Sequence, residues 1–313
     1  ARNSLLIGNL MNGNLYNFLV FGVSLNDFTH SIDTSNSVDG KPIHYLINQK
    51  GLVINPATFP QVGYLALVNS TNVKVEGLTL MNNGEGLIFA YTNNSKIVAN
   101  NIANNDRGIR LFCSSGNRIY HNNFINNFDQ AWECTSSYND WDDGYPSGGN
   151  HWSDYEHGYP DAQELNGSGI WDTPYIIRGN DRDKYPLRGM FSDFNATSEY
   201  DVTTVSNSTI SDFQFNGTAI RFNATGENGT TSFCRVTIPH NLLSPPYNVT
   251  INNNLVQYTI VLENDTLSII YFHYEHSTQE IVIVAEFPSI LILSSLMIFT
   301  SVTVVISKKK RHT

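Results

Sequence analysis

The stretch that decides the fold is residues 69–136, which repeats every 22 residues. It reads NSTNVKVEGLTLMNNGEGLIFA from Asn69, YTNNSKIVANNIANNDRGIRLF from Tyr91 and CSSGNRIYHNNFINNFDQAWEC from Cys113. The recurring positions are Val75, Ile97 and Ile119, then Leu80, Ile102 and Phe124, then the pairs Asn82-Asn83, Asn104-Asn105 and Asn126-Asn127. A fixed period of this length indicates three coils of one solenoid. Apolar and polar residues alternate within each coil, which is typical of short strands.

Two kinds of solenoid fit this period. A leucine-rich horseshoe would place Leu78 inside, but the same position holds Asn100 and Asn122 in the next two coils, and a horseshoe would have to bury their amides. A parallel β-helix instead places Asn at its tight turns, because Asn tolerates left-handed backbone angles and its amide can bond to the same amide one coil away. The sequence therefore favours an all-β fold built on a parallel β-helix.

Longer strings carry a family resemblance. They are NSVDGKPIHYL from Asn36, GYLALVNSTNVKVEGLTL from Gly63, NNSKIVANNIANNDRGIRL from Asn93, NRIYHNNFINN from Asn117, WDDGYPSGGNHWSDY from Trp141 and TPYIIRGNDRDKYPL from Thr173. With these strings the chain resembles the NosD-like group of right-handed parallel β-helix repeat proteins, especially its archaeal surface members. The resemblance covers nearly the whole chain and implies the fold. It implies little about activity, because the group is named after a copper-enzyme accessory protein and a fold does not fix a function.

The composition is that of an exported acidic protein. The formal net charge is −10 at pH 7, which makes nucleic acid an unfavourable partner. Glycosylation sequons such as Asn216 and Asn228 gather in the last third of the chain, which fits either a glycosylated surface or chance in an Asn-rich sequence. The chain begins at Ala1 without an apolar leader, so we expect an export signal and further coils upstream.

The carboxyl end predicts a membrane anchor. Residues 290–306 contain no charge, and residues 287–307 would span about 31 Å as a helix, enough to cross a hydrocarbon core. The basic tail at 308–313 places the carboxyl end in the cytoplasm and the bulk of the protein outside the cell, on a single-pass anchor. Two alternatives stay open, a buried core helix and a sorting signal whose apolar part is removed.

The rest of the chain divides into three predicted domains. Residues 1–136 carry the β-helix, with a hairpin or a wider coil around the turn at Asp39-Gly40. Residues 137–195 lose the period and gather Trp, Asp and Gly, so we expect them to cap the open end of the helix. Residues 196–285 alternate again between turns, as in a small antiparallel β-sandwich. Cys113 and Cys134 fall on neighbouring coils, where a disulfide needs a bend that realigns them.

Aromatic and acidic residues of the segment 137–195 form the first candidate ligand site. The residues are Trp141, Trp152 and Trp171 with Asp142 and Asp143. Flat rings beside carboxylates suit a sugar, whereas the alternative interpretation is that the rings only cover the core at the end of the helix. The acidic run at 140–143 suits calcium by residue type, but it lacks the ligand spacing of a dedicated loop.

Stacking of the coils predicts two columns of charge. The first holds Glu85, Arg107 and Asp129, which is either a ladder of exposed ion pairs or, if the protein is an enzyme, the acid pair of a polysaccharide hydrolase or lyase. Arg107 is expected to lower the pKa of both carboxyls, which leaves no proton donor. The second column holds Lys74, Lys96 and Arg118. It would bind an acidic polysaccharide unless carboxylates of the next segment neutralise it.

Copper binding is the third functional hypothesis, and the residues give it little support. Most His residues are isolated, and only His151 with His157, or His273 with His276, lie close along the chain. A soft or imidazole-rich metal site is not indicated, so no metal and no cofactor is expected. No recognisable motif frames a catalytic serine. The sequence therefore predicts a membrane-anchored extracellular protein that binds carbohydrate or surface-layer proteins without catalysis, with an enzyme and then a copper accessory protein as the alternatives.

Overall fold

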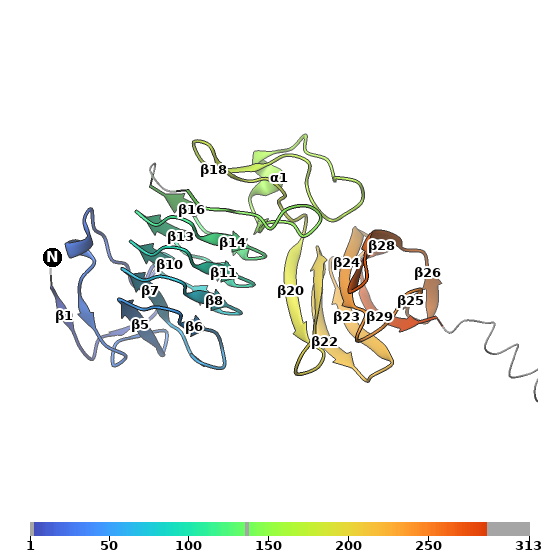
Figure 1. Cartoon of the computed structure of the whole chain (residues 1–313), viewed down its shortest axis with the longest axis horizontal. Helices are drawn as coiled ribbons and strands as arrows, with labels where there is room; N and C mark the ends of the chain where they lie inside the picture. Colours follow the sequence, from blue (N-terminus) through green and yellow to red (C-terminus); the bar gives the residue numbers. More distant parts are fainter. Residues whose placement is uncertain (1–2, 135–137, 287–313) are drawn as a thin grey trace, which may run out of the picture.

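The computed structural model describes residues 3–134 and 138–286 of the chain (Figure 1). The predicted membrane helix at 287–307 and the basic tail at 308–313 lie outside the described residues. Within the described ranges no helix is both long and apolar enough to cross a membrane. Figure 1 shows a stack of short strands, a loop-rich segment over its last rung, and a β-sandwich beside both.

The first body is a parallel β-helix with three sheets. The largest sheet has the order β16-β13-β10-β7-β5-β4-β2, and its strands are β2 (Leu10–Met11), β4 (Ser37–Val38), β5 (Lys41–Ile47), β7 (Tyr64–Val68), β10 (Glu85–Ala90), β13 (Arg107–Phe112) and β16 (Asp129–Glu133). The second sheet contains β6 (Val53–Ile54), β8 (Lys74–Glu76), β11 (Lys96–Val98) and β14 (Arg118–Tyr120). The third contains β9 (Thr79–Met81), β12 (Asn101–Ala103), β15 (Asn123–Ile125) and β17 (His151–Trp152).

The strand register follows the sequence period. Ile97 pairs with Ile119 and Ile102 pairs with Phe124, in both cases 22 residues apart. All four side chains are fully buried in the core of the helix, where the rows of apolar residues stack coil on coil. The predicted parallel β-helix with 22-residue coils is therefore confirmed.

Asparagine forms the turns and also stabilises them. Asn104 has a φ of +54° and is exposed, whereas the following Asn105 is buried. The Asn105 amide donates to the Oδ1 atom of Asn127 at 2.9 Å and to the Leu80 carbonyl at 3.2 Å. A second ladder runs from Asn100 through Asn122 in the same way. Asn100 and Asn105 thus each donate to the equivalent amide of the next coil and to a carbonyl of the preceding coil, which satisfies their buried N–H groups.

The amino-terminal segment crosses the outer face of the largest sheet. It contains β1 (Leu5–Leu6), η1 (Leu25–Asp27) and β3 (Ser31–Ile32), and the predicted hairpin follows where β4 pairs antiparallel with β5. Val20 and Phe28 are buried against Tyr64 and Ile88 of the sheet. We call residues 14–30 the arm. Because the arm covers these outward-facing side chains, the outer face of the first coils is a second core rather than an open surface.

Residues 138–189 cover the last coil and are called the cap. The cap contains α1 (Tyr155–Gly158) and the antiparallel pair β18 (Tyr175–Arg178) and β19 (Asp181–Asp183). The Trp152 ring stacks on Phe124 at 4.4 Å and on Tyr175 at 4.2 Å between ring centroids. This stack continues the apolar interior of the helix into the cap, so that the core is not open at its end.

The last body is an antiparallel β-sandwich that begins at Met190, before the predicted boundary at 196. One sheet has the order β20-β21-β24-β28-β27, with β20 (Met190–Asn195), β21 (Asp201–Ser206), β24 (Thr231–Pro239), β28 (Leu267–Glu275) and β27 (Thr259–Glu263). The other has the order β22-β23-β29-β25-β26, with β22 (Thr209–Phe215), β23 (Ala219–Thr225), β29 (Thr278–Ala285), β25 (Tyr247–Ile251) and β26 (Asn254–Val256). Its core includes Phe222, Cys234 and Phe272.

Candidate functional site

The main candidate site is a cleft between the β-helix and the sandwich. Its volume is about 620 Å³. Its polar lining includes Asn55, Glu76 and Asn101 from the helix and Asp193, Asn195 and Asp201 from the sandwich, and its apolar lining includes Met190 and Phe191. We call it the interdomain cleft. Successive coils and strands β20 and β21 supply these groups, so residues far apart in the sequence converge on one space.

A rigid joint holds the two walls of the cleft together. Asn123 of β15 accepts a hydrogen bond from the Phe191 amide at 2.8 Å and donates to the Phe191 carbonyl at 2.8 Å. The His121 ring stacks on the Phe191 ring with 4.3 Å between centroids. Burial lowers the pKa of His121 to about 4, so this imidazole stays neutral at physiological pH. The cleft is therefore a preformed space rather than a gap between loosely tethered domains.

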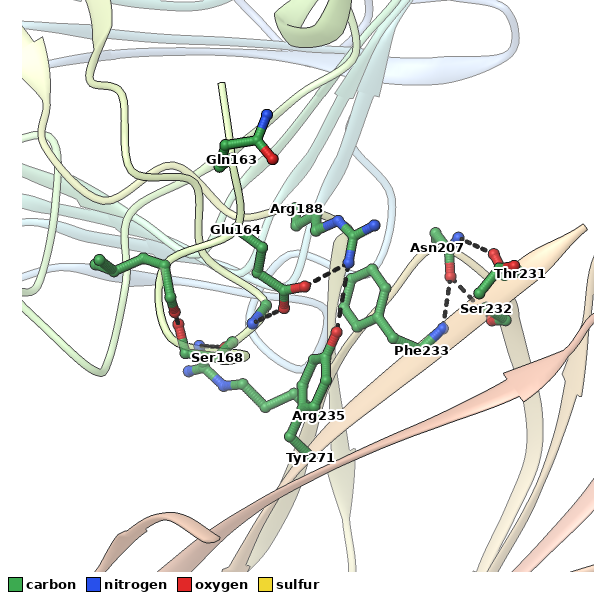
Figure 2. A network of polar contacts seen from close by, with 12 residues as sticks. Gln163, Glu164, Ser168, Arg188, Asn207, Thr231, Ser232, Phe233, Arg235 and Tyr271 are labelled. Carbon is green, nitrogen blue, oxygen red and sulfur yellow. Dashed lines mark hydrogen bonds and ion pairs between the residues drawn. The ribbon is translucent and has the colours of Figure 1, made fainter. Parts of the chain in front are cut away.

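The cap is fastened to the sandwich as well. Figure 2 shows Arg188 between Glu164 and Tyr271, with 2.6 Å from its Nη1 to Glu164 Oε2 and 3.4 Å to the Tyr271 hydroxyl. Arg235 donates to the Ser168 carbonyl at 3.3 Å, and its guanidinium is buried. In the same view the side-chain oxygen of Asn207 accepts a hydrogen bond from the Phe233 backbone N–H, and its side-chain nitrogen donates to the Thr231 carbonyl.

The interdomain cleft is acidic. Burial, and after it the charges of Asp201 and Glu76, raise the pKa of Asp193 to about 6. The pKa of Asp201 is raised for the same reasons, first burial and then Glu76. The carboxyls of Asp193 and Asp201, with Glu76 close to both, make a poor site for an anion and a good one for hydroxyl groups or a positive charge.

The predicted basic column is present, but most of its charge is neutralised. Lys96 pairs with Lys74 and with Arg118 in the register, as the period predicts. Lys74 forms an ion pair with Glu76, and Arg118 forms one with Asp143 of the cap. Among the described residues, no carboxylate lies within ion-pair distance of Lys96. The alternative stated from the sequence is that carboxylates of the next segment neutralise the column. Arg118 fits this alternative, because its partner Asp143 belongs to the cap.

The predicted acidic column has the expected register but not the expected environment. Glu85 pairs with Arg107, and Arg107 pairs with Asp129. Glu85 is 1% exposed, and its partner is Arg110 at 3.3 Å rather than Arg107. Arg107 lies 3.8 Å from Asp129. The prediction of an exposed three-residue ladder is wrong for Glu85, because the arm closes over this carboxylate and the Arg110 carbons.

The predicted pKa direction in this column is also wrong. Burial raises the pKa of Glu85, and the Arg110 charge opposes this only in part. Burial also raises the pKa of Asp129 against the effect of Arg107. Desolvation of the charged form outweighs the attraction to the nearby guanidinium in both cases. Raised pKa values suit a proton donor, but Glu85 lies beneath the arm, where Arg110 donates to the Val20 and Gly22 carbonyls.

The Trp and Asp residues predicted to bind a ligand are mostly structural. Trp141 and Trp152 are each 1% exposed within the core of the helix, so neither presents a face to a sugar. Trp171 is half-buried and stacks on Tyr155 at 5.2 Å. The Asp142 carboxylate accepts from the Gly144 and Lys184 amides, and Asp143 binds Arg118 and Ser147. These contacts favour the interpretation of the segment as a cap.

A comparison with protein families agrees with this architecture. The model of the family described as periplasmic copper-binding protein (NosD) matches residues 3–157, about half of the chain. The chain is a NosD-like parallel β-helix protein. A periplasmic or extracellular location of the described part fits this family. No curated protein and no solved structure gives a significant match.

The described residues of this NosD-like chain contain no ligand set that matches the copper of the family description. The described residues bring no three His, Cys, Asp or Glu side chains together in a way that could hold a metal ion. His121 and His151 are partly buried, and burial lowers the pKa of each to about 4. His121 is also engaged with the Ser147 carbonyl. We therefore derive no copper chemistry from these residues.

One pair of polar side chains could not be predicted from the sequence. Ser208 and His276 of the NosD-like protein are 68 residues apart, yet the Ser208 hydroxyl lies 2.9 Å from His276 Nε2. A serine beside an imidazole suits nucleophilic catalysis. However, the same hydroxyl also contacts Ser232 at 2.7 Å and Tyr274 at 2.8 Å and is nearly buried. Three neighbours engage this hydroxyl in a buried hydrogen-bond network, so we assign it a structural role.

Proposed function

We propose that this NosD-like protein binds carbohydrate outside the cytoplasm without catalysing a reaction, and that the interdomain cleft holds the sugar. The lining of the cleft supports the proposal. Glu76, Asp193 and Asp201 offer carboxylate oxygens to sugar hydroxyls. Met190 and Phe191 offer apolar surface to the face of a sugar ring. A volume of about 620 Å³ has room for a short oligosaccharide.

The charges in and near the cleft favour a neutral glycan over an acidic one. The carboxylates of Asp193 and Asp201 would repel uronate or sulfate groups, whereas Glu76 is already paired with Lys74. The basic column, which the sequence offers to an acidic polysaccharide, already has Glu76 and Asp143 as internal partners. A neutral glycan needs no counter-charge, and its hydroxyls can replace the water around Asp193 and Asp201.

The hydrolase or lyase alternative has weaker support. It requires Glu85 and Asp129 to reach the same substrate, with Arg107 between them. Glu85 is covered by the arm, and Asp129 lies on the next coil but one. Binding without turnover by the purified protein is therefore the expected result, and cleavage of any polysaccharide that is lost in Asp129→Asn would contradict it.

The proposal includes a membrane anchor and a place at the cell surface, where neutral glycans and surface-layer proteins are the partners. It rests on the apolar run at 287–307 and on the basic tail. Protease added to intact cells should remove the bulk of the chain and spare the tail. A tail that is digested from outside, or a mature protein that lacks it, would rule out a simple single-pass anchor.

The cleft is tested by a glycan array probed with the full-length protein. Neutral oligosaccharides should bind and acidic ones should not. Asp193→Asn and Glu76→Gln should each weaken binding about tenfold or more, because a charge-assisted hydrogen bond is lost. Asp161→Asn, on an exposed part of the cap, is the matched control and should change nothing. Unaltered binding in both cleft variants, with normal unfolding temperatures, would place the sugar elsewhere.

A further inference from the structure

Two cysteines meet across neighbouring coils of the β-helix. Cys113 directly follows β13 and Cys134 directly follows β16, and their Sγ atoms are 3.7 Å apart. The two residues are 21 positions apart, one short of the period. The chain corrects this offset at Cys113, whose φ of +47° bends the backbone out of the strand. The side chains of non-equivalent positions are thereby brought face to face.

We propose that Cys113 and Cys134 are joined by a disulfide in the exported protein, so that one whole coil is closed covalently. Disulfides form and persist outside the cytoplasm, where the NosD-like family places this chain. Both side chains are half-buried at the end of their strands. The sulfur atoms are already in contact at 3.7 Å, so a closer approach of these two side chains would bring them to bonding distance.

The third cysteine cannot compete for this bond. Cys234 is fully buried in the core of the sandwich, on β24, and belongs to a different body of the protein. Only one intramolecular pairing is therefore open to the native fold. This absence of alternatives suits a structural disulfide, since exchange with a wrong partner would require unfolding of the sandwich.

The bond would fasten one edge of the largest sheet. β16 is the edge strand of that sheet and pairs only with β13 within it. A loop of about one coil, closed by the disulfide, restricts the unfolded chain and keeps β16 in register where it meets the cap. The disulfide would thus stabilise the β16 end of the largest sheet, as the arm stabilises the first coils.

The chemistry is thiol–disulfide exchange with an oxidised thiol oxidoreductase. One cysteine thiolate attacks a sulfur of the carrier's disulfide, and a mixed disulfide forms. The second thiolate displaces the carrier, which leaves as a dithiol and has thereby taken up the two electrons and the two protons of the cysteines. Burial and the neighbouring Cys134 raise the pKa of the Cys113 thiol, which lowers the fraction of thiolate that is available for the attack.

The test is alkylation of the full chain, purified after export and denatured without reductant, followed by mass spectrometry. The expected result is one alkylated cysteine, Cys234, and a linked peptide that contains Cys113 and Cys134. After reduction all three cysteines should react. Three alkylated cysteines without reductant, also after incubation in oxidising glutathione buffer, would overturn the proposal. The proposal would also be overturned if Cys113 and Cys134 resist alkylation only when Cu(I) is added and react again after a copper chelator removes it.

A second measurement tests what the bond does. Reductant should lower the unfolding temperature of the wild-type β-helix by on the order of 5 °C and leave Cys134→Ser unchanged. Cys234→Ala is the matched control and should keep the full response to reductant. An equal response of wild type and Cys134→Ser would show that the pair does not fasten the coil.

Discussion

The coils of the β-helix and the cap solve the same problem in different ways. Both bury polar side chains next to an apolar core. In the coils a buried amide meets a copy of itself, as Asn105 meets Asn127. In the cap the buried Asp183 carboxylate meets unlike groups, namely the Asn150 amide and the Trp152 indole. Repeated contacts leave a period in the sequence, and unique contacts leave none.

The boundary between the two regions shows where the period fails. The ladder of Asn100 and Asn122 continues to Asn150, but the last step is 28 residues rather than 22. Asp183 then accepts hydrogen bonds from the Asn150 backbone at 2.7 Å and from the Trp152 ring at 2.9 Å. One carboxylate therefore ends the ladder of amides and ties the cap to the last coil.

The largest expected effect comes from breaking the coils. Ile119→Asp places a charge at a fully buried position, between the side chains of two neighbouring coils. No partner is available there, so the β-helix should not fold. The measurement is circular dichroism with thermal unfolding. Ile119→Val, which removes one methylene group, is the control and should cost only about 1 kcal/mol. Native unfolding of the Asp variant would contradict the assigned register.

A change at Asp183 should loosen the cap and leave the coils folded. Burial raises the pKa of Asp183 to about 7 from 3.8, although its hydrogen bonds oppose this rise. Between these values the folded state keeps a proton that the unfolded state has lost, so stability falls as the pH rises from about 4 to about 7 and then levels off.

Asp183→Asn removes this titration, and the difference in unfolding free energy between wild type and variant should change with pH only in that window. Hydrogen exchange would locate the effect at the backbone amides of Asn150 and Tyr185, which donate hydrogen bonds to the Asp183 carboxylate. A difference that does not depend on pH would show that Asp183 does not titrate there.

Two adjacent asparagines separate the contribution of the buried amide ladder from that of the exposed turn. Asn105→Ala leaves the Asn83 amide without its acceptor and the Leu80 carbonyl without its donor, and should cost about 2 kcal/mol. Asn104→Gly should cost little, because Asn104 is exposed and glycine accepts its left-handed backbone. Equal losses in urea unfolding would mean that the ladder contributes no more than the turn.

The smallest effect is expected at Arg107. Its partner Asp129 is 3.8 Å away and both side chains are more than a third exposed. Arg107→Gln should therefore change the free energy of unfolding by less than about 0.5 kcal/mol. A loss as large as that of Asn105→Ala would show that the exposed pair is more than a surface contact.

The sequence by itself determined the β-helix, its period and the rows of its core. Even for the β-helix, the argument that excluded the leucine-rich horseshoe was incomplete. The horseshoe was disfavoured because it would bury Asn100 and Asn122, yet the β-helix buries both of them fully. It can do so because each amide donates to a strand carbonyl and to the next amide, as Asn100 does to Val75 and Asn122. The period predicted the stacking, but not on which side of the turn the amide lies.

Only the tertiary structure decided the candidate site and the environment of Glu85. Glu85 is buried because the arm, some sixty residues earlier in the chain, folds over it, and no local pattern encodes that contact. Glu76 and Asp193 share a cleft because Asn123 and His121 join the helix to the sandwich through Phe191. A repeat fixes the distance between equivalent residues in the sequence itself, whereas packing between unlike segments depends on shapes and charges that exist only after both have folded.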